Sequence, residues 1–165
     1  MKRIDISTPK YPSTFALVDD EDYEWLNQWK WYAVPGQKTF YAARQIRTKA
    51  GRGGQRIVFM HRMILGLERI DQTESDHKNG NGLDNQRQNV RKATRVQNCR
   101  NRSGRQNTKS KYKGVVGRSN KWRARITVEH KQFHLGYFRT EFAAAKAYDK
   151  KAKELFGEFA RLNTI

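Results

Sequence analysis

The chain has 165 residues and carries 34 Lys and Arg against 16 Asp and Glu, which gives a formal net charge of +18. This charge favours a polyanionic partner over a membrane or a small-molecule substrate. Hydrophobic residues make up 36% and aromatic residues 12%, a composition that excludes full disorder and favours two or three small modules over one large core.

The first 56 residues predict a small β-rich module. Apolar residues at 4–6 and 15–18 predict two short strands, and the alternation within 31–60, with turn signals at 35–36 and 50–54, predicts two or three more antiparallel strands. The acidic run 19–22 precedes an aromatic segment and is interpreted as the capped start of a helix, with a metal site as the alternative.

The segment from 57 to 102 predicts a strand, a short helix and then a strand–loop–strand–helix unit. The short helix covers 61–67 and ends near Gly66. His61, at its start, is interpreted as a packed or capping residue, with a phosphate contact as the alternative. Thr94 and Gln97 form a capping-box pattern that predicts the start of the last helix.

This unit can bring four polar residues together, namely Asp76, His77, Asn89 and Asn98. A neutral His can take a proton from water near pH 7. Carboxylate and amide oxygens are hard ligands that suit Mg²⁺ or another divalent metal such as Mn²⁺. An amide that accepts the N–H of a His fixes its tautomer and orientation. The pattern therefore predicts metal-assisted phosphodiester hydrolysis.

The Asp-His pair, the Leu-Asp-Asn of the loop, the Asn-Val-Arg strand and the Gln-Asn of the helix resemble the HNH nucleases, which have the ββα-metal fold. The resemblance is to the homing-endonuclease branch, in which Asn replaces the last His. It implies that His77 is the general base, that Asp76 and Asn98 are metal ligands, and that Asn89 orients His77. Asp84 and Asn85 are expected to shape the loop through Asx turns, with a catalytic role as the alternative.

Residues 102–111 contain no apolar residue, which predicts a basic linker over 103–110. Arg105 and Lys109 in this linker are candidates for contacts along a DNA groove. The alternative is a solvated tether.

Residues 111–165 predict a three-stranded antiparallel sheet packed on one helix. The strands cover 112–118, 122–128 and 132–138, and the helix runs from an N-cap at Thr140 to about Phe156, before Gly157. In the second strand Arg123, Arg125 and Thr127 share one face. In the third strand, alternation places Phe133, Leu135 and Tyr137 together, opposite Gln132, His134 and Gly136.

The Tyr-Lys-Gly-Val-Val-Gly, Trp-Arg-Ala-Arg-Ile and His-Leu-Gly-Tyr-Phe runs of this module resemble the APETALA/ethylene-response-factor (ERF) DNA-binding domain. The resemblance implies that the sheet enters the groove of double-stranded DNA through Val116, Arg118, Arg123, Arg125, Thr127, Gln132 and His134. Val116 and Arg125 differ in type from the plant pattern, so the sequence preference does not transfer. Phosphate contact is the alternative role for Arg123.

Other function classes have no support in the sequence. No apolar run approaches the roughly 20 residues that span a membrane, and residues 1–5 do not resemble a signal peptide. One cysteine, Cys99, excludes a disulfide framework and a Cys-rich zinc site. We expect a cytoplasmic protein of a phage or a bacterial host.

These patterns together predict an α+β protein with four parts: a β module (1–56), an HNH core (57–102), a linker (103–110) and an ERF-like domain (111–165). The function expected is that of a site-specific DNA endonuclease of the homing type, and the sequence leaves open whether it cuts one strand or both. A monomer is expected, with a dimer as the alternative; a monomer would nick, and a double-strand break needs a dimer or two successive events. The alternatives are a DNA-binding regulator that retains the nuclease fold and a basic RNA-binding protein.

Overall fold

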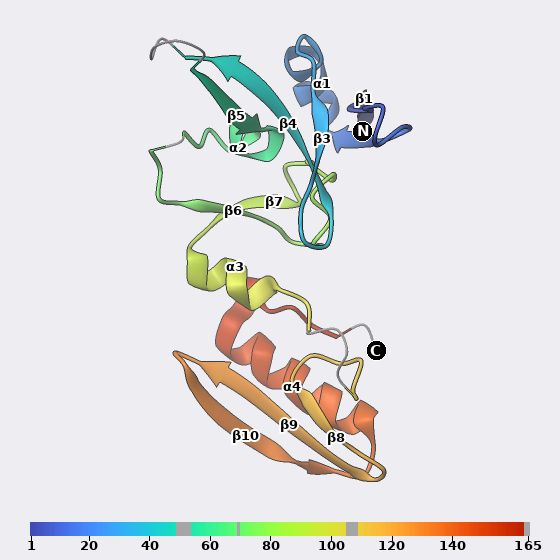
Figure 1. Cartoon of the computed structure of the whole chain (residues 1–165). Coiled ribbons are helices and arrows are strands. Elements are labelled where there is room, and N and C mark those ends of the chain that lie inside the picture. The colour runs from blue at the N-terminus through green and yellow to red at the C-terminus, as the bar shows by residue number, and fades with distance from the viewer. Residues whose placement is uncertain (49–53, 69, 105–108, 164–165) are drawn as a thin grey trace. The chain divides into compact units, whose positions relative to one another are not determined.

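The computed structural model describes residues 1–48, 54–68, 70–104 and 109–163, and the chain divides into two compact units (Figure 1). Unit 1 covers Met1–Arg95 and unit 2 covers Val96–Ile165. Each unit is described by itself below. Among the described residues, small antiparallel sheets and four α-helices give an α+β fold, and no helix is long and apolar enough to cross a membrane.

Unit 1 contains three small sheets and two helices. In the first sheet β1 pairs with β2, in the second the order is β3-β4-β5, and in the third β6 pairs with β7; all pairs are antiparallel. The elements in chain order are β1 (Lys2–Asp5), β2 (Phe15–Val18), α1 (Asp20–Asn27), β3 (Tyr32–Pro35), β4 (Phe40–Arg47), β5 (Gln55–Phe59), α2 (Met60–Ile64), β6 (Glu74–His77) and β7 (Val90–Ala93).

One hydrophobic core holds unit 1 together. It joins Ile4 and Val18 from the first sheet and Leu26 from α1 to Met60 from α2 and Val90 from β7. The boundary expected at residue 56 therefore does not separate two compact bodies. Residues 1–56 supply most of this core, and Met60, Ile64 and Val90 of the next segment are buried in it.

Unit 2 begins with α3 (Arg95–Asn101) and continues with a three-stranded sheet of order β10-β9-β8 and a long helix. The strands are β8 (Val115–Arg118), β9 (Lys121–Val128) and β10 (Lys131–Phe138). Helix α4 (Glu141–Phe156) covers one face of the sheet, and a 3₁₀ turn (Gly157–Phe159) follows it (Figure 1).

The termini of α4 follow the sequence prediction. Thr140 Oγ1 accepts a hydrogen bond from the backbone N–H of Ala143 at 3.1 Å, which satisfies one of the free donors at the start of the helix. Gly157 ends the helix with a φ of 53°, a conformation that favours glycine. Ala124 and Ile126 of β9 are buried on the α4 side.

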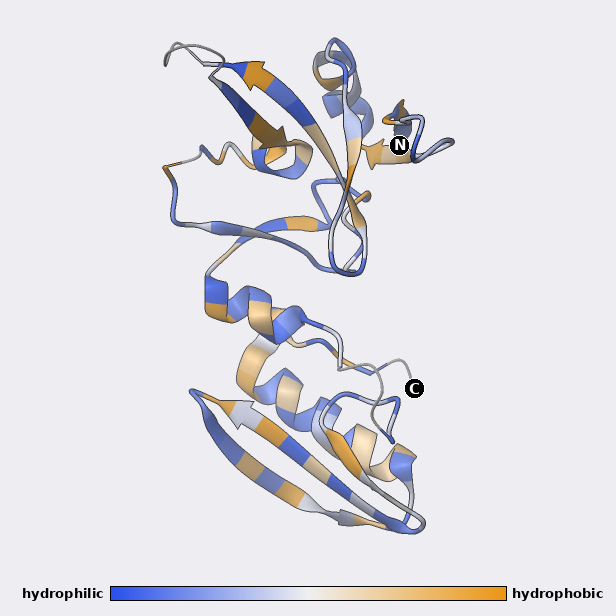
Figure 2. Ribbon diagram, viewed as in Figure 1, coloured by the Kyte–Doolittle hydropathy of each residue, from blue (hydrophilic) through white to orange (hydrophobic). Residues whose placement is uncertain are grey.

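A β-bulge in β10 changes which residues share the outer face of the sheet. The register passes from His134 opposite Arg125 to Gly136 opposite Ala124, so Leu135 is an extra residue. Gly136 has a φ of 129°, which a residue with a Cβ rarely adopts. The alternation is interrupted, and Tyr137, expected beside Phe133 and Leu135, is 72% exposed. Figure 2 shows the alternating hydropathy of β9 and β10.

Candidate active site and nucleic-acid interface

The loop of residues 78–89 joins β6 to β7 and is attached to the N-terminal sheet. The backbone N–H of Leu17 donates to the Leu83 carbonyl, and the N–H of Asn85 donates to the Leu17 carbonyl, both at 2.8 Å. The side chain of Thr39 accepts from the N–H of Gly82 at 2.9 Å. The N-terminal strands therefore act as a frame that fixes the loop.

The acidic start of α1 holds the same loop, which differs from the capping role expected from the sequence. Asp19 is the N-cap residue, but its carboxylate accepts from the backbone N–H of Arg87 at 2.7 Å and caps no N–H of its own helix. Buried Asp22 accepts from Nε and Nη2 of Arg87 at 2.8 and 2.7 Å and from Trp25 at 2.9 Å. The acidic run therefore binds Arg87 and holds it in place, since a buried carboxylate requires a charged or hydrogen-bonding partner.

His77 ends β6 and is buried at 7% exposure. Its Nε2 lies 3.3 Å from the Oδ1 of buried Asn85. Burial lowers the pKa of His77, while the hydrogen bond to Asn85 and the charges of Asp76 and Asp84 oppose this change. The ring is therefore neutral near pH 7, as a general base must be.

Asn85, and not Asn89, supplies the amide at His77. The Oδ1 of Asn89 accepts from the backbone N–H of Asn79 at 3.0 Å, and its Nδ2 donates to the Asp84 carbonyl at 2.7 Å. Asn89 therefore links both ends of the loop. The signal for Asn85 is its place in the Leu-Asp-Asn run, three residues after Gly82, where the folded chain allows no Cβ because it would lie 2.5 Å from the Phe40 carbonyl oxygen.

Asp76 is paired with a buried arginine. It lies opposite Arg91 in the β6–β7 ladder, and its Oδ2 accepts from Nε and Nη2 of Arg91 at 2.9 and 2.7 Å. The exposed fractions of the two residues are 5% and 8%. The pairing gives the buried carboxylate a cationic partner, beside the His77 backbone.

The predicted metal ligands are hard oxygen donors, but they supply only part of the coordination shell of a divalent cation. Among the described residues, no group of three or more His, Cys, Asp and Glu side chains could hold a metal ion. Asp76 offers a carboxylate in unit 1, and Asn98, half-buried on α3, offers an amide in unit 2. A single carboxylate suits Mg²⁺ as a partial shell, because this ion keeps several waters and takes phosphate oxygens as ligands.

His61, which the sequence placed outside the constellation, lies against His77. The two ring centroids are 4.8 Å apart with an interplanar angle of 76°. Burial, aided by the charges of His77 and Arg62, lowers the pKa of His61 to about 3. Its Nδ1 is buried and has no hydrogen-bond partner among the described groups.

Mild acid is expected to destabilise unit 1 through His61. Below its unfolded pKa of 6.5 the unfolded chain binds a proton that the folded protein does not bind until about pH 3. Stability is therefore complete above pH 6.5 and falls by about 1.4 kcal/mol per pH unit below it, or about 2 kcal/mol between pH 7 and pH 5. Urea unfolding at both pH values measures the loss. His61→Phe should remove the part that His61 contributes, while the part from His77, whose pKa burial also lowers, remains. An equal loss in this variant would contradict the assignment.

The outer face of the unit 2 sheet gathers most of the residues expected to contact DNA. Cross-strand pairs place Val116 and Tyr137 beside Arg123, His134 beside Arg125, and Gln132 beside Thr127. Nη1 of Arg125 donates to Gln132 Oε1 at 3.2 Å, and the rings of His134 and Tyr137 lie 4.6 Å apart. Arg118 ends β8, and its side chain lies outside the described structure. Tyr137 also lies on this face, which the alternation in the sequence does not predict.

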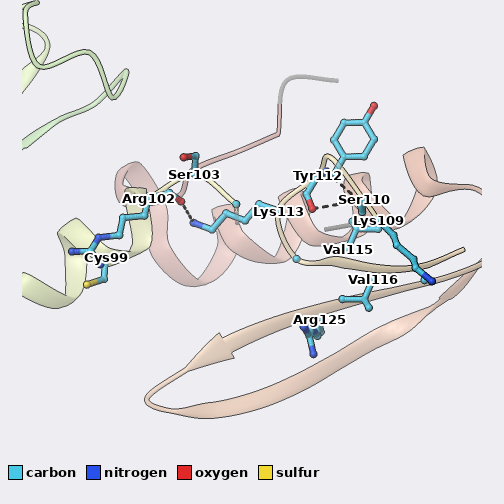
Figure 3. Close-up of a pocket in the computed structure, with 13 residues that line it drawn as sticks. Cys99, Arg102, Ser103, Lys109, Ser110, Tyr112, Lys113, Val115, Val116 and Arg125 are labelled. Atoms are coloured by element: carbon cyan, nitrogen blue, oxygen red, sulfur yellow. Dashed lines mark hydrogen bonds between the residues drawn. The ribbon is translucent and has the colours of Figure 1, made fainter. Parts of the chain in front are cut away.

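The residues that flank the linker line a cavity of about 840 Å³ in unit 2 (Figure 3). Lys109 and Arg125 both line it, together with Arg102 and Lys113. Nζ of Lys113 donates to the carbonyls of Arg100 and Arg102 at 2.5 and 2.7 Å, and burial lowers the pKa of this amine to about 8. The cavity is rich in cationic side chains. Arg105 lies outside the described residues.

Comparison with known proteins finds a relative in Acanthamoeba polyphaga mimivirus that is described as an uncharacterized HNH endonuclease. It is 30% identical to this chain over 154 residues, which are 92% of this chain and 76% of the relative. No protein-family model matches the chain, and no solved structure matches it significantly.

Proposed function

The chain belongs to the HNH endonuclease family, and we propose that it is a metal-dependent DNA endonuclease of the homing type whose C-terminal sheet positions the target. The observation that carries this proposal is the adjacent pair of Asp76 and His77 at the end of β6, both buried, with Asn85 on the imidazole. A charged oxygen ligand and a neutral base thus lie side by side on a frame fixed by the core.

In the proposed mechanism His77 takes the proton of the attacking water. The Oδ1 of Asn85 is an acceptor beside Nε2, which favours the tautomer with its proton on Nε2 and its basic lone pair on the other ring nitrogen. Asn89 keeps both ends of the loop together, and the Arg87 anchor fixes the loop to α1. These contacts keep the base in place when DNA arrives, and fixed geometry of this kind contributes to catalysis.

Asp76 would hold the divalent cation, Mg²⁺ or Mn²⁺, and Asn98 stays the second ligand that the resemblance to HNH nucleases implies. When bound, such an ion supplies charge stabilisation at the phosphate and at the leaving oxygen. The Arg91 guanidinium, which donates two hydrogen bonds to Oδ2 of Asp76, would hold the carboxylate in a fixed orientation for the ion.

Purified full-length protein is expected to cut or nick duplex DNA only in the presence of a divalent metal. The substrate is DNA that spans the gene's own locus, and mapping of the product ends gives the site and shows whether one strand or both are cut. A monomer carries one site and should nick first. Cleavage that persists in excess EDTA would exclude the metal mechanism.

The outer sheet face is proposed as the surface that reads DNA. Lys109 and Arg105 are proposed to contact the DNA backbone. Arg125 is held by Gln132, and a fixed guanidinium suits bidentate contact with guanine in the major groove. Val116, 37% exposed beside Arg123, adds an apolar group of the kind that contacts a thymine methyl.

Loss of the sheet arginines is expected to weaken DNA binding more than loss of equal charge elsewhere. Each phosphate contact contributes about −0.9 to the slope of log K against log salt. Arg123→Ala with Arg125→Ala should lower affinity and, where these side chains contact phosphate, flatten the slope. The matched control is Lys150→Ala with Lys153→Ala on α4, where both lysines are exposed. Anisotropy titrations at several salt concentrations measure the affinity and the slope for both double variants. Equal effects of the two double variants would contradict the outer sheet face as the DNA-binding surface.

A second candidate function is a DNA-binding regulator that does not cleave. The Asp76–Arg91 pair favours it, because an arginine already neutralises the carboxylate. The metal-dependent cleavage assay separates the two functions, since a regulator would bind DNA with the same salt dependence and leave it intact.

A further inference from the structure

Four rings from four elements meet around the proposed base. His61 of α2 lies edge-to-face against His77 of β6, with centroids 4.8 Å apart. Tyr41 of β4 contacts both, at 5.7 Å from His61 and 5.9 Å from His77. Phe59 of β5 stacks on His61 at 5.5 Å with an angle of 20°. The position of His61 is therefore fixed by rings on either side of it.

Asn85 contacts His77 at one ring atom, Nε2. A hydrogen bond at one atom does not set the plane of a ring, because the last torsion of a His side chain has broad minima. Edge-to-face packing does restrict that plane, since an aromatic neighbour at this distance leaves little room for rotation. His61 and Tyr41 supply this restriction on His77.

We propose that His61 is a positioning residue for His77, whose ring holds the plane of the catalytic imidazole. This inference rests on the proposed function for its effect on cleavage, but the ring contact itself does not. The action is through the ring, because the Nδ1 of His61 is buried and makes no hydrogen bond with the described groups. A phenyl ring would pack at the same place without a buried unpaired nitrogen.

The test compares His61→Ala with His61→Phe in the full chain. Displacement of a reacting group by about 1 Å can lower a rate by about 100-fold. His61→Ala is therefore expected to slow single-turnover cleavage by about 10- to 100-fold with unchanged DNA affinity, and His61→Phe to stay within about threefold of the wild type. The control is Ile64→Ala, a buried aliphatic residue on the same helix, which destabilises the core but removes no ring.

A second readout does not depend on activity. The chain has four His residues, so the His77 imidazole can be assigned by NMR from single variants. Its ring signals should shift and broaden in His61→Ala and remain close to the wild type in His61→Phe. Unchanged His77 signals in His61→Ala, or a His61→Phe variant as slow as His61→Ala, would overturn the proposal. If the wild type does not cleave DNA at all, the proposed function fails and the NMR comparison still decides the positioning role.

Discussion

Replacement of His77 by alanine is expected to lower DNA cleavage by about 100-fold or more, because general-base catalysis contributes about 10²- to 10⁴-fold. Affinity for DNA should persist. His77 is 7% exposed and can offer little contact area to DNA, and the basic face lies in unit 2. Single-turnover cleavage and anisotropy titration of the same duplex measure the two effects.

The matched control for His77→Ala is His130→Asn. His130 lies in the turn between β9 and β10 with a φ of 64°, a conformation that Asn tolerates. This variant should keep cleavage near the wild-type rate. If His77→Ala cleaves as fast as the wild type, the mechanism is wrong, and if it loses DNA binding in parallel, His77 has a structural role.

The secondary structure was predictable where a local pattern decides it. Helix α4 follows from its apolar stripe between Thr140 and Gly157, and β9 from the alternation of small apolar residues with arginines. Asp76 and His77 could be found because they are adjacent in the sequence and end a strand.

The partners of His77 were not predictable, because they depend on tertiary packing. Asn85 and Asn89 have the same side chain and lie in the same loop, and only the folded loop shows which amide faces the imidazole. His61 lies beside His77 because the segments before and after residue 56 share one core, whereas the sequence predicts two separate modules there. Gly136 is the only sign of the bulge at Leu135 in the sequence, so the alternation places Tyr137 on the wrong face of the sheet.

Replacement of Arg91 by methionine is expected to be the most destabilising change at the site. It leaves the Asp76 carboxylate buried without its guanidinium partner, and loss of one member of a buried ion pair costs about 3 to 5 kcal/mol. Adding Asp76→Asn should restore much of the stability, because the uncompensated charge is then absent. Urea unfolding at pH 7 followed by tryptophan fluorescence measures both variants, and a double variant as unstable as Arg91→Met would contradict the electrostatic cause.

The same variants test Asp76 as a metal ligand without reference to activity. In Arg91→Met a divalent cation can take the place of the guanidinium, so Mg²⁺ should raise the unfolding midpoint of this variant more than that of the wild type. The double variant, with an amide in place of the carboxylate, should show a much smaller response, since Mg²⁺ binds through one or two carboxylates. Equal responses of all three proteins would remove Asp76 from the metal site and favour the regulator that does not cleave. A response confined to Arg91→Met would mean that the Arg91 guanidinium competes with the metal for Oδ2 of Asp76 in the wild type.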